Sequence, residues 1–331
     1  MIYKNVEIFN VSELTEGEYG MQTHRLPTSV EAALSEKGKE VNKSASGVEI
    51  RFRMLGDSVK LRLSLGSNAY LYRGSVLGGW QDFSHQIAGH GGSEIVIERM
   101  KNPERYWAVT ESGNYPFSPE VVRIVCNNGT LQIIDVEGEC EPPCAADLPK
   151  RTYLAYGSSI TSGSLSLTKP SSFVSMVGEH FRTDVRNLGL AGAALVEKEV
   201  ADHIAEMGAR GEWDFATLCM GINCLTLPDE EIYRRVSYMI ETVAGANPDK
   251  HIFCISPLYS NVDLNGGPSP GRWRRIIGEL VEKYNSDKVH YINGLTLMDG
   301  AWGLSGDFVH PAPIGVRAIA KNLIDQMEKY I

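Results

Sequence analysis

The run Tyr153-Leu154-Ala155-Tyr156-Gly157-Ser158-Ser159-Ile160-Thr161 decides the fold of the second half of this chain. Its first four residues form an apolar stretch of strand length, and a glycine and two serines follow directly. Similar apolar strands recur after it, and each is followed by a segment with helical spacing of its apolar residues. The predicted strands comprise residues 153–156, 185–188, 215–220, 252–255 and 289–292. Such alternation predicts a parallel sheet covered by helices on both faces, with ligands beyond the carboxyl ends of the strands, where Ser159 lies.

The first half of the chain has a different rhythm. Short runs alternate apolar and polar residues with period two, which predicts half-buried antiparallel strands at residues 48–52, 59–63, 94–97, 121–125 and 131–134. Asn128-Gly129 lies between the last two runs and predicts a hairpin there, because both residues tolerate positive φ. Residues 139–150 contain three prolines and resemble a linker. We therefore expect a jelly-roll-like β-sandwich over residues 1–145 and an α/β domain over residues 146–331.

The composition disfavours several classes of protein. At 331 residues the chain exceeds the usual size of one domain, and its net charge of -9 disfavours nucleic acid as a partner. The N-terminus lacks the pattern of a signal peptide, and no apolar run of about 18 residues occurs. We expect a cytoplasmic protein without a membrane partner, and a homo-oligomer stays open.

Neither a metal nor a cofactor is implied by the sequence. The cysteines lack the paired spacing of a zinc site and are interpreted as buried thiols: Cys126, Cys140, Cys144, Cys219, Cys224 and Cys254. A disulfide between Cys140 and Cys144, which flank two prolines, is the less favoured alternative. His85 and His90 have no acidic or cysteine partners at ligand spacing, so a structural or exposed role is favoured. No dinucleotide or P-loop fingerprint follows any predicted strand.

A nucleophile, a base and an orienting carboxylate are all present. A serine hydroxyl attacks an ester only if a base takes its proton, and an imidazole needs a partner that fixes its tautomer. Asp307 and His310 are three residues apart, so the carboxylate can reach Nδ1 and leave Nε2 free for Ser159. Pro311 disfavours helical φ/ψ at His310, which favours projection of the ring from a loop. The Gly-x-Ser-x-Gly elbow is absent because Thr161 occupies its second glycine position.

The order of these residues resembles the SGNH hydrolases, also called the GDSL esterase family. That family carries separated blocks anchored by Ser, Gly, Asn and His, and the matching segments here are residues 157–161, 187–192, 221–224 and 307–310. The resemblance covers residues 151–331 and implies a three-layer α/β/α, flavodoxin-like domain. It also implies that Ser159 is the nucleophile, and that the backbone N–H groups of Ser159 and Gly192 and the amide of Asn223 form an oxyanion hole.

Three positions qualify this assignment. Gly189 could be the glycine that allows close approach, which would leave Gly192 as a helix-entry residue. Ser158 replaces the Asp of the GDSL name, and Cys224 replaces the Asp that often follows the block-three Asn. Neither substituted position is the nucleophile, base or primary oxyanion donor. We therefore expect retained chemistry with altered hydrogen bonding around the site.

The two-domain arrangement also resembles carbohydrate esterase family 2. That likeness implies a serine esterase that removes short acyl groups, acetyl foremost, from carbohydrates or similar small molecules. Trp80, Gln81 and Asp82 have the chemistry of a sugar-binding rim. Two alternatives stay open: an acyltransferase using the same triad, and a carbohydrate-binding protein whose hydrolase domain has decayed.

Overall fold

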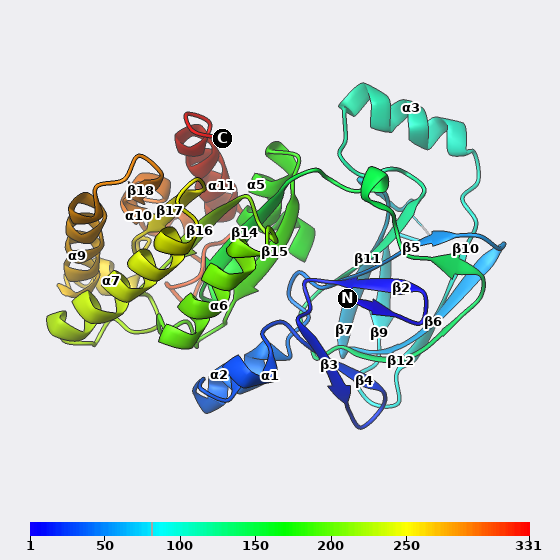
Figure 1. Cartoon of the computed structure of the whole chain (residues 1–331), viewed down its shortest axis with the longest axis horizontal. Coiled ribbons are helices and arrows are strands. Elements are labelled where there is room, and N and C mark those ends of the chain that lie inside the picture. The colour runs from blue at the N-terminus through cyan, green and yellow to red at the C-terminus, as the bar shows by residue number, and fades with distance from the viewer. Residues whose placement is uncertain (81) are drawn as a thin grey trace. The chain divides into compact units, whose positions relative to one another are not determined.

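The computed structural model describes residues 1–80 and 82–331, which form two compact units (Figure 1). The first unit comprises Met1–Thr28, Asn42–Lys150 and Arg182–Asp184, and the second comprises Ser29–Val41, Arg151–Phe181 and Val185–Ile331. Two short segments belong to a different unit from the chain on either side of them. One is residues 29–41, and the other is residues 182–184.

The first unit is a sandwich of two antiparallel sheets. The larger sheet has the order β1 (Ile2–Tyr3), β2 (Val6–Phe9), β5 (Glu49–Met54), β11 (Val121–Cys126), β7 (Ser67–Arg73) and β8 (Val76–Leu77), with β13 (Cys140–Glu141) paired to β5 and β9 (Ser84–Ile87) paired to β7. The smaller sheet has the order β10 (Ser93–Glu98), β6 (Ser58–Ser64), β12 (Gln132–Glu137), β4 (Met21–His24) and β3 (Glu13–Glu16). The same unit contains helix α3 (Pro103–Gly113). Because β13 pairs with β5, the segment expected to be a linker begins inside the sandwich.

Period two explains the core of this unit. Along β6, Val59, Leu61 and Leu63 are fully buried, whereas the residues between them reach the surface. Alternate side chains of a strand point to opposite faces, so one face of each sheet supplies the apolar core and the other stays polar. The antiparallel sandwich predicted from this pattern is confirmed.

The hairpin predicted at Asn128-Gly129 is wrong. β11 pairs with β5 and β7, whereas β12 pairs with β4 and β6, so the turn joins the two sheets. Gly129 has φ +112°, and a Cβ there would collide with the carbonyl oxygen of Leu65. Of the two residues only Gly129 has a positive φ. Local sequence does not determine whether the following strand turns back onto its neighbour or crosses to the facing sheet.

The second unit contains the predicted parallel sheet. Its strand order is β15 (Asp184–Gly189), β14 (Thr152–Gly157), β16 (Phe215–Cys219), β17 (His251–Ile255) and β18 (Val289–Ile292). The helices that follow these strands are α4 (Ser159–Ser162), α5 (Phe173–His180), α6 (Lys198–Ala209), α7 (Asp229–Ala246), α8 (Asn261–Leu264), α9 (Ser269–Tyr284), α10 (Gly294–Leu297) and α11 (Pro313–Met327). Two further helices come from the N-terminal part of the chain: α1 (Thr28–Glu31) and α2 (Glu36–Asn42).

Helices cover both faces of this sheet, as predicted. Helix α5 packs against α11, while α7 packs against α6 and α9 (Figure 1). Tyr153, Phe215 and Phe253 point to the side of α5 and α11 and join Val177 and Leu323 in one buried cluster. Because the strands are buried on both faces, they read as continuous apolar runs.

In the described part of the chain, every helix is too short or too polar to cross a lipid bilayer.

Candidate active site

The nucleophile candidate stands at the carboxyl end of β14. Ser159 is the first residue of α4, and the hydroxyl of Ser158 caps this helix by accepting the N–H of Ile160 at 3.3 Å. Gly157 is required at the turn, since a Cβ there would collide with the hydroxyl of Thr161. The sharp exit from strand to helix therefore depends on one glycine and one serine cap.

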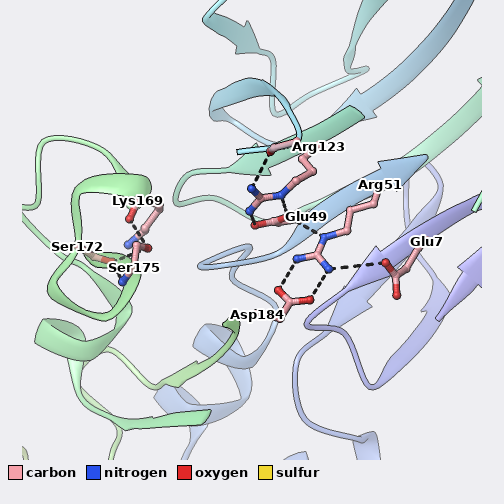
Figure 2. Close-up of polar contacts among 9 residues, drawn as sticks. Glu7, Glu49, Arg51, Arg123, Lys169, Ser172, Ser175 and Asp184 are labelled. Carbon is pink, nitrogen blue, oxygen red and sulfur yellow. Dashed lines mark hydrogen bonds and ion pairs between the residues drawn. The ribbon is translucent and has the colours of Figure 1, made fainter. Parts of the chain in front are cut away.

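The far end of α4 is held by a buried lysine. Lys169 is 3% exposed, and its ammonium group donates to the carbonyl oxygen of Ser162, the last residue of α4. The carbonyl of Lys169 accepts the hydroxyl of Ser175 at 2.9 Å, and Ser172 bonds Ser175 in turn (Figure 2). A cation at the carboxyl end of a helix is favourable, so these contacts fix the element that carries Ser159.

The structure brings Ser159, His310 and Asp307 into one line of hydrogen bonds. The Ser159 hydroxyl lies 2.7 Å from His310 Nε2, and His310 Nδ1 lies 2.7 Å from Asp307 Oδ2. With the proton of Nδ1 directed at the carboxylate, Nε2 is the nitrogen that can accept from Ser159. Ser159 and His310 are separated by 151 positions in the sequence, so only the tertiary fold could join them.

Asp307 is itself held by a tight loop. Its Oδ1 accepts the backbone N–H groups of Val309 and His310 and the hydroxyl of Ser305, each at 2.9 Å. Burial alone would raise the pKa of the Asp307 carboxyl, but these donors and the His310 ring outweigh it and hold the pKa well below its usual range. Phe308, between the two, adopts φ +57°, a conformation that non-glycine residues rarely take. Asp307 therefore stays ionised beside the imidazole.

The two glycines of the second block have separate roles. A Cβ on Gly189 would collide with the backbone of Ser162, so Gly189 allows the strand end to pack against α4. Gly192 has φ +70° and open space where its Cβ would be, and it lines the cavity in front of Ser159. Asn223 lines the same cavity, and its Oδ1 accepts the N–H of Ala194 at 3.2 Å. That bond orients the amide, and among the described residues its NH₂ has no acceptor.

All five residues predicted for the site meet in one cavity of about 630 Å³. They are Ser159, Gly192, Asn223, Asp307 and His310. The cavity also has apolar walls that the sequence did not indicate, formed by Leu165, Ala191, Ile222, Leu225 and Val262. Leu165, Ala191, Ile222 and Leu225 lie in loops and Val262 in the one-turn helix α8, so no periodic pattern marks them.

Lys37 is the lining residue that was hardest to foresee. It belongs to α2, lines the same cavity and forms an ion pair with Glu40 at 2.9 Å. Residues 29–41 pack with the second unit although the chain before and after them belongs to the sandwich. Lys37 is far in the sequence from the other lining residues, so local sequence patterns do not place it at the site.

The two departures from the family pattern are accommodated locally. Ser158 is 1% exposed and caps α4 as described above. Cys224 is 6% exposed, and burial raises the pKa of its thiol to about 12, so it is a neutral group. Neither residue replaces a donor or acceptor in the line from Ser159 to Asp307.

The remaining candidates from the sequence stand apart from this cavity. His90 Nδ1 lies 3.1 Å from the hydroxyl of Tyr19, and His85 lines a separate cavity in the first unit. No cluster of three or more potential metal ligands occurs among residues 1–80 and 82–331. Of the suggested sugar rim, Gln81 lies outside the described residues, Asp82 lines the cavity of His85, and Trp80 is 92% exposed.

Residues 155–318 match the GDSL-like lipase/acylhydrolase family. The α/β unit of this chain therefore belongs to that family. The matched range includes the four blocks named above, residues 157–161, 187–192, 221–224 and 307–310. No curated protein matches the sequence.

Several solved structures share the two-domain fold. A salicylyl-acyltransferase from a tetracycline biosynthetic pathway aligns with a TM-score of 0.79 and 14% identity, over 98% of this chain and 95% of that chain. A family two carbohydrate esterase from Clostridium thermocellum, in complex with cellohexaose, aligns with a TM-score of 0.58 and 13% identity over 85% and 91%. An acetyl xylan esterase from the rumen bacterium Butyrivibrio proteoclasticus aligns with a TM-score of 0.57 and 14% identity over 99% and 96%. At these identities the likeness shows the fold, including the N-terminal β-sandwich typical of carbohydrate esterase family 2.

Proposed function

We propose that the chain is a serine esterase that removes short acyl groups, acetyl foremost, from carbohydrates or similar hydroxylated small molecules. The observation that carries this proposal is the line of hydrogen bonds from Ser159 through His310 to Asp307, with 2.7 Å at each of its two joints. The acetylated sugar as substrate is supported by the fold shared with family two carbohydrate esterases.

In the proposed mechanism, the Ser159 hydroxyl attacks the ester carbonyl while His310 Nε2 takes its proton. Asp307 stabilises the imidazolium that forms. The negative charge that develops on the carbonyl oxygen is met by the N–H groups of Ser159 and Gly192 and the amide of Asn223. Collapse of this intermediate expels the alcohol, which receives the proton from His310. Water then attacks the acyl-enzyme with His310 again as base, releasing the acid and restoring Ser159.

Hydrolysis of p-nitrophenyl acetate tests this proposal. We expect Ser159→Ala to lower kcat/KM at least about 10³-fold, because the covalent route is lost. Ser164→Ala is the matched control, since Ser164 lines the same cavity and stands outside the bonded line. Equal rates for wild type and Ser159→Ala would remove Ser159 from the mechanism. A panel of acetylated sugars and p-nitrophenyl esters of rising chain length then defines the acyl group.

Acyl transfer to an alcohol other than water is the second candidate. It is supported by the apolar walls around Ser159, which disfavour water at the acyl-enzyme, and by the fold shared with a salicylyl-acyltransferase. Product analysis with an added acceptor alcohol separates the two: a transferase yields mainly the new ester, and an esterase mainly the free acid.

A carbohydrate-binding protein with a decayed hydrolase domain fits the geometry less well, because the line from Ser159 to Asp307 is unbroken. Labelling of Ser159 by a fluorophosphonate would exclude that alternative.

A further inference from the structure

A second cavity, of about 750 Å³, lies wholly within the first unit. It is lined by residues of β7, β8 and β9 from the larger sheet, β10 from the smaller sheet, and the start of α3. Its volume is within the usual range for sites that hold small molecules. No residue of the line from Ser159 to Asp307 contributes to it.

One wall of the cavity carries a buried guanidinium group. Arg73, the last residue of β7, is 9% exposed, donates to the backbone carbonyl of Glu98 and lies 3.4 Å from the sulfur of Met54. Among the described residues, no carboxylate lies within ion-pair distance of it. Burial lowers the pKa of Arg73, and the smaller opposing effects of Tyr106, Asp82 and Glu120 do not offset it.

Two other buried arginines of this chain have carboxylate partners. Arg51 is fully buried and forms ion pairs with Glu49 and Asp184, and Arg274, 8% exposed, forms one with Asp263. A buried cation is ordinarily paired because its desolvation is costly. Arg73 differs from these two arginines, and it lies at the wall of a cavity.

Two further groups in the cavity are available to a ligand. The Nε2 atom of His85 is buried and has no hydrogen-bond partner among the described residues. Arg105, in the first turn of α3, has no ion pair in the described chain, whereas Arg99 and Lys101 are engaged with Asp57 and Glu98. The cavity thus offers two guanidinium groups that have no carboxylate partner among the described residues, in a protein of net charge -9.

We propose that this cavity binds an acidic sugar whose carboxylate or phosphate pairs with Arg73 and Arg105. A guanidinium fork matches the two oxygens of either group. His85, Asp82 and Asn102 line the same cavity and supply polar partners for hydroxyl groups, while Leu77 and Tyr106 supply apolar walls for a sugar ring. Neither the binding nor its test depends on the chemistry of Ser159.

Calorimetric titration of the full chain with trigalacturonate, glucose 6-phosphate, inorganic phosphate and neutral cellotriose tests this site. We expect one of the two acidic sugars to bind with one-to-one stoichiometry, at least about tenfold more tightly than cellotriose or inorganic phosphate. The preferred sugar tells a carboxylate from a phosphate. Binding of cellotriose or inorganic phosphate with equal affinity, or of neither acidic sugar, overturns the proposal.

Variants locate the binding. Arg73→Met should raise Kd at least about tenfold and Arg105→Gln several-fold. Lys60→Met removes the same charge on β6, outside the cavity, and should leave Kd unchanged, as should Ser159→Ala. Without ligand, Arg73→Met should retain or raise Tm, because it removes a buried charge. Arg73→Lys keeps the charge but loses the planar guanidinium group, so it should also weaken binding. It replaces Arg73→Met in this test if Arg73→Met does not fold. Unchanged affinity in the folded Arg73 variants overturns the proposal.

Discussion

At the scale of single residues, each hydrogen bond of the site fixes the orientation or the charge of one side chain. The Asp307 carboxylate fixes the tautomer and orientation of His310, and four donors fix Asp307 itself. The Asn223 amide is oriented by the N–H of Ala194. Because each bond has a distinct task, each can be removed separately.

Asp307→Asn should lower kcat for p-nitrophenyl acetate by about 10²–10⁴ while the protein stays folded. An amide keeps an oxygen that can accept the N–H groups of Val309 and His310, but it cannot stabilise the imidazolium as a carboxylate does. Steady-state kinetics and a thermal melt check this. A kcat within threefold of wild type would contradict the role of Asp307.

Asn223→Ala should lower kcat by about 10²–10³, with a smaller change in KM, because an oxyanion donor acts mainly on the transition state. The substitution also removes the acceptor for Ala194, so a thermal melt must accompany the kinetics. Asn223→Asp is the matched comparison, since it can keep that acceptor and loses the donor. If Asn223→Asp keeps the wild-type kcat, Asn223 is not an oxyanion donor.

At the scale of elements, the ends of strands and helices carry the site. β14 ends at Gly157 and α4 begins at Ser159, so a single turn positions the proposed nucleophile. Helix α6 is preceded by Glu197, whose carboxylate accepts the N–H of Leu195 at 3.1 Å. The other oxygen of Glu197 is buried without a partner among the described residues. An acidic group in such surroundings resists ionisation.

The stability of the second unit should depend on the protonation of Glu197. Burial raises the pKa of its carboxyl in the folded state. A raised pKa contributes stability that is complete below the unfolded pKa of about 4.3 and is lost as the pH rises through the folded pKa. Glu197→Gln does not titrate, so its free energy of unfolding relative to wild type should improve as the pH rises from about 4 to 7. Urea melts at several pH values measure this, and a difference independent of pH would contradict it.

At the scale of the whole molecule, the chain divides into two units, one with a buried charged network and the other with the proposed active site. The sandwich unit holds a buried network of Glu7, Glu49, Arg51, Arg123 and Asp184 (Figure 2). Asp184 binds Arg51 through two bonds of 2.6 and 2.7 Å. Removing one member of such a network leaves a buried charge uncompensated.

This network should make the sandwich sensitive to acid. Burial alone would raise the pKa of Glu49, but the guanidinium groups of Arg123 and Arg51 hold it well below its usual range. A lowered pKa contributes stability that is present above about pH 4.3 and is lost as the pH falls through the folded pKa. We expect Glu49→Gln to lower the free energy of unfolding by about 3 kcal/mol at pH 7 and by less near pH 3.

Glu94→Gln is the control for that prediction. Glu94 is 46% exposed and lies 3.5 Å from Lys60, so its loss should change stability by less than about 1 kcal/mol. Denaturant melts of both variants at pH 7 and pH 3 provide the comparison. Equal effects of the two substitutions would contradict a special role of the buried network.

Much of this protein follows from the order of its residues. The period-two runs determine the sandwich, the strand–helix alternation determines the parallel sheet, and the spacing of Asp307 and His310 determines their bond, because each depends on neighbours in the sequence. Tertiary structure alone decided three other features. Ser159 and His310 form a hydrogen bond, the chain passes from one sheet to the other at Gly129, and Lys37 lines the cavity. Each of these features depends on how whole helices and strands pack against one another. No local sequence pattern encodes that packing.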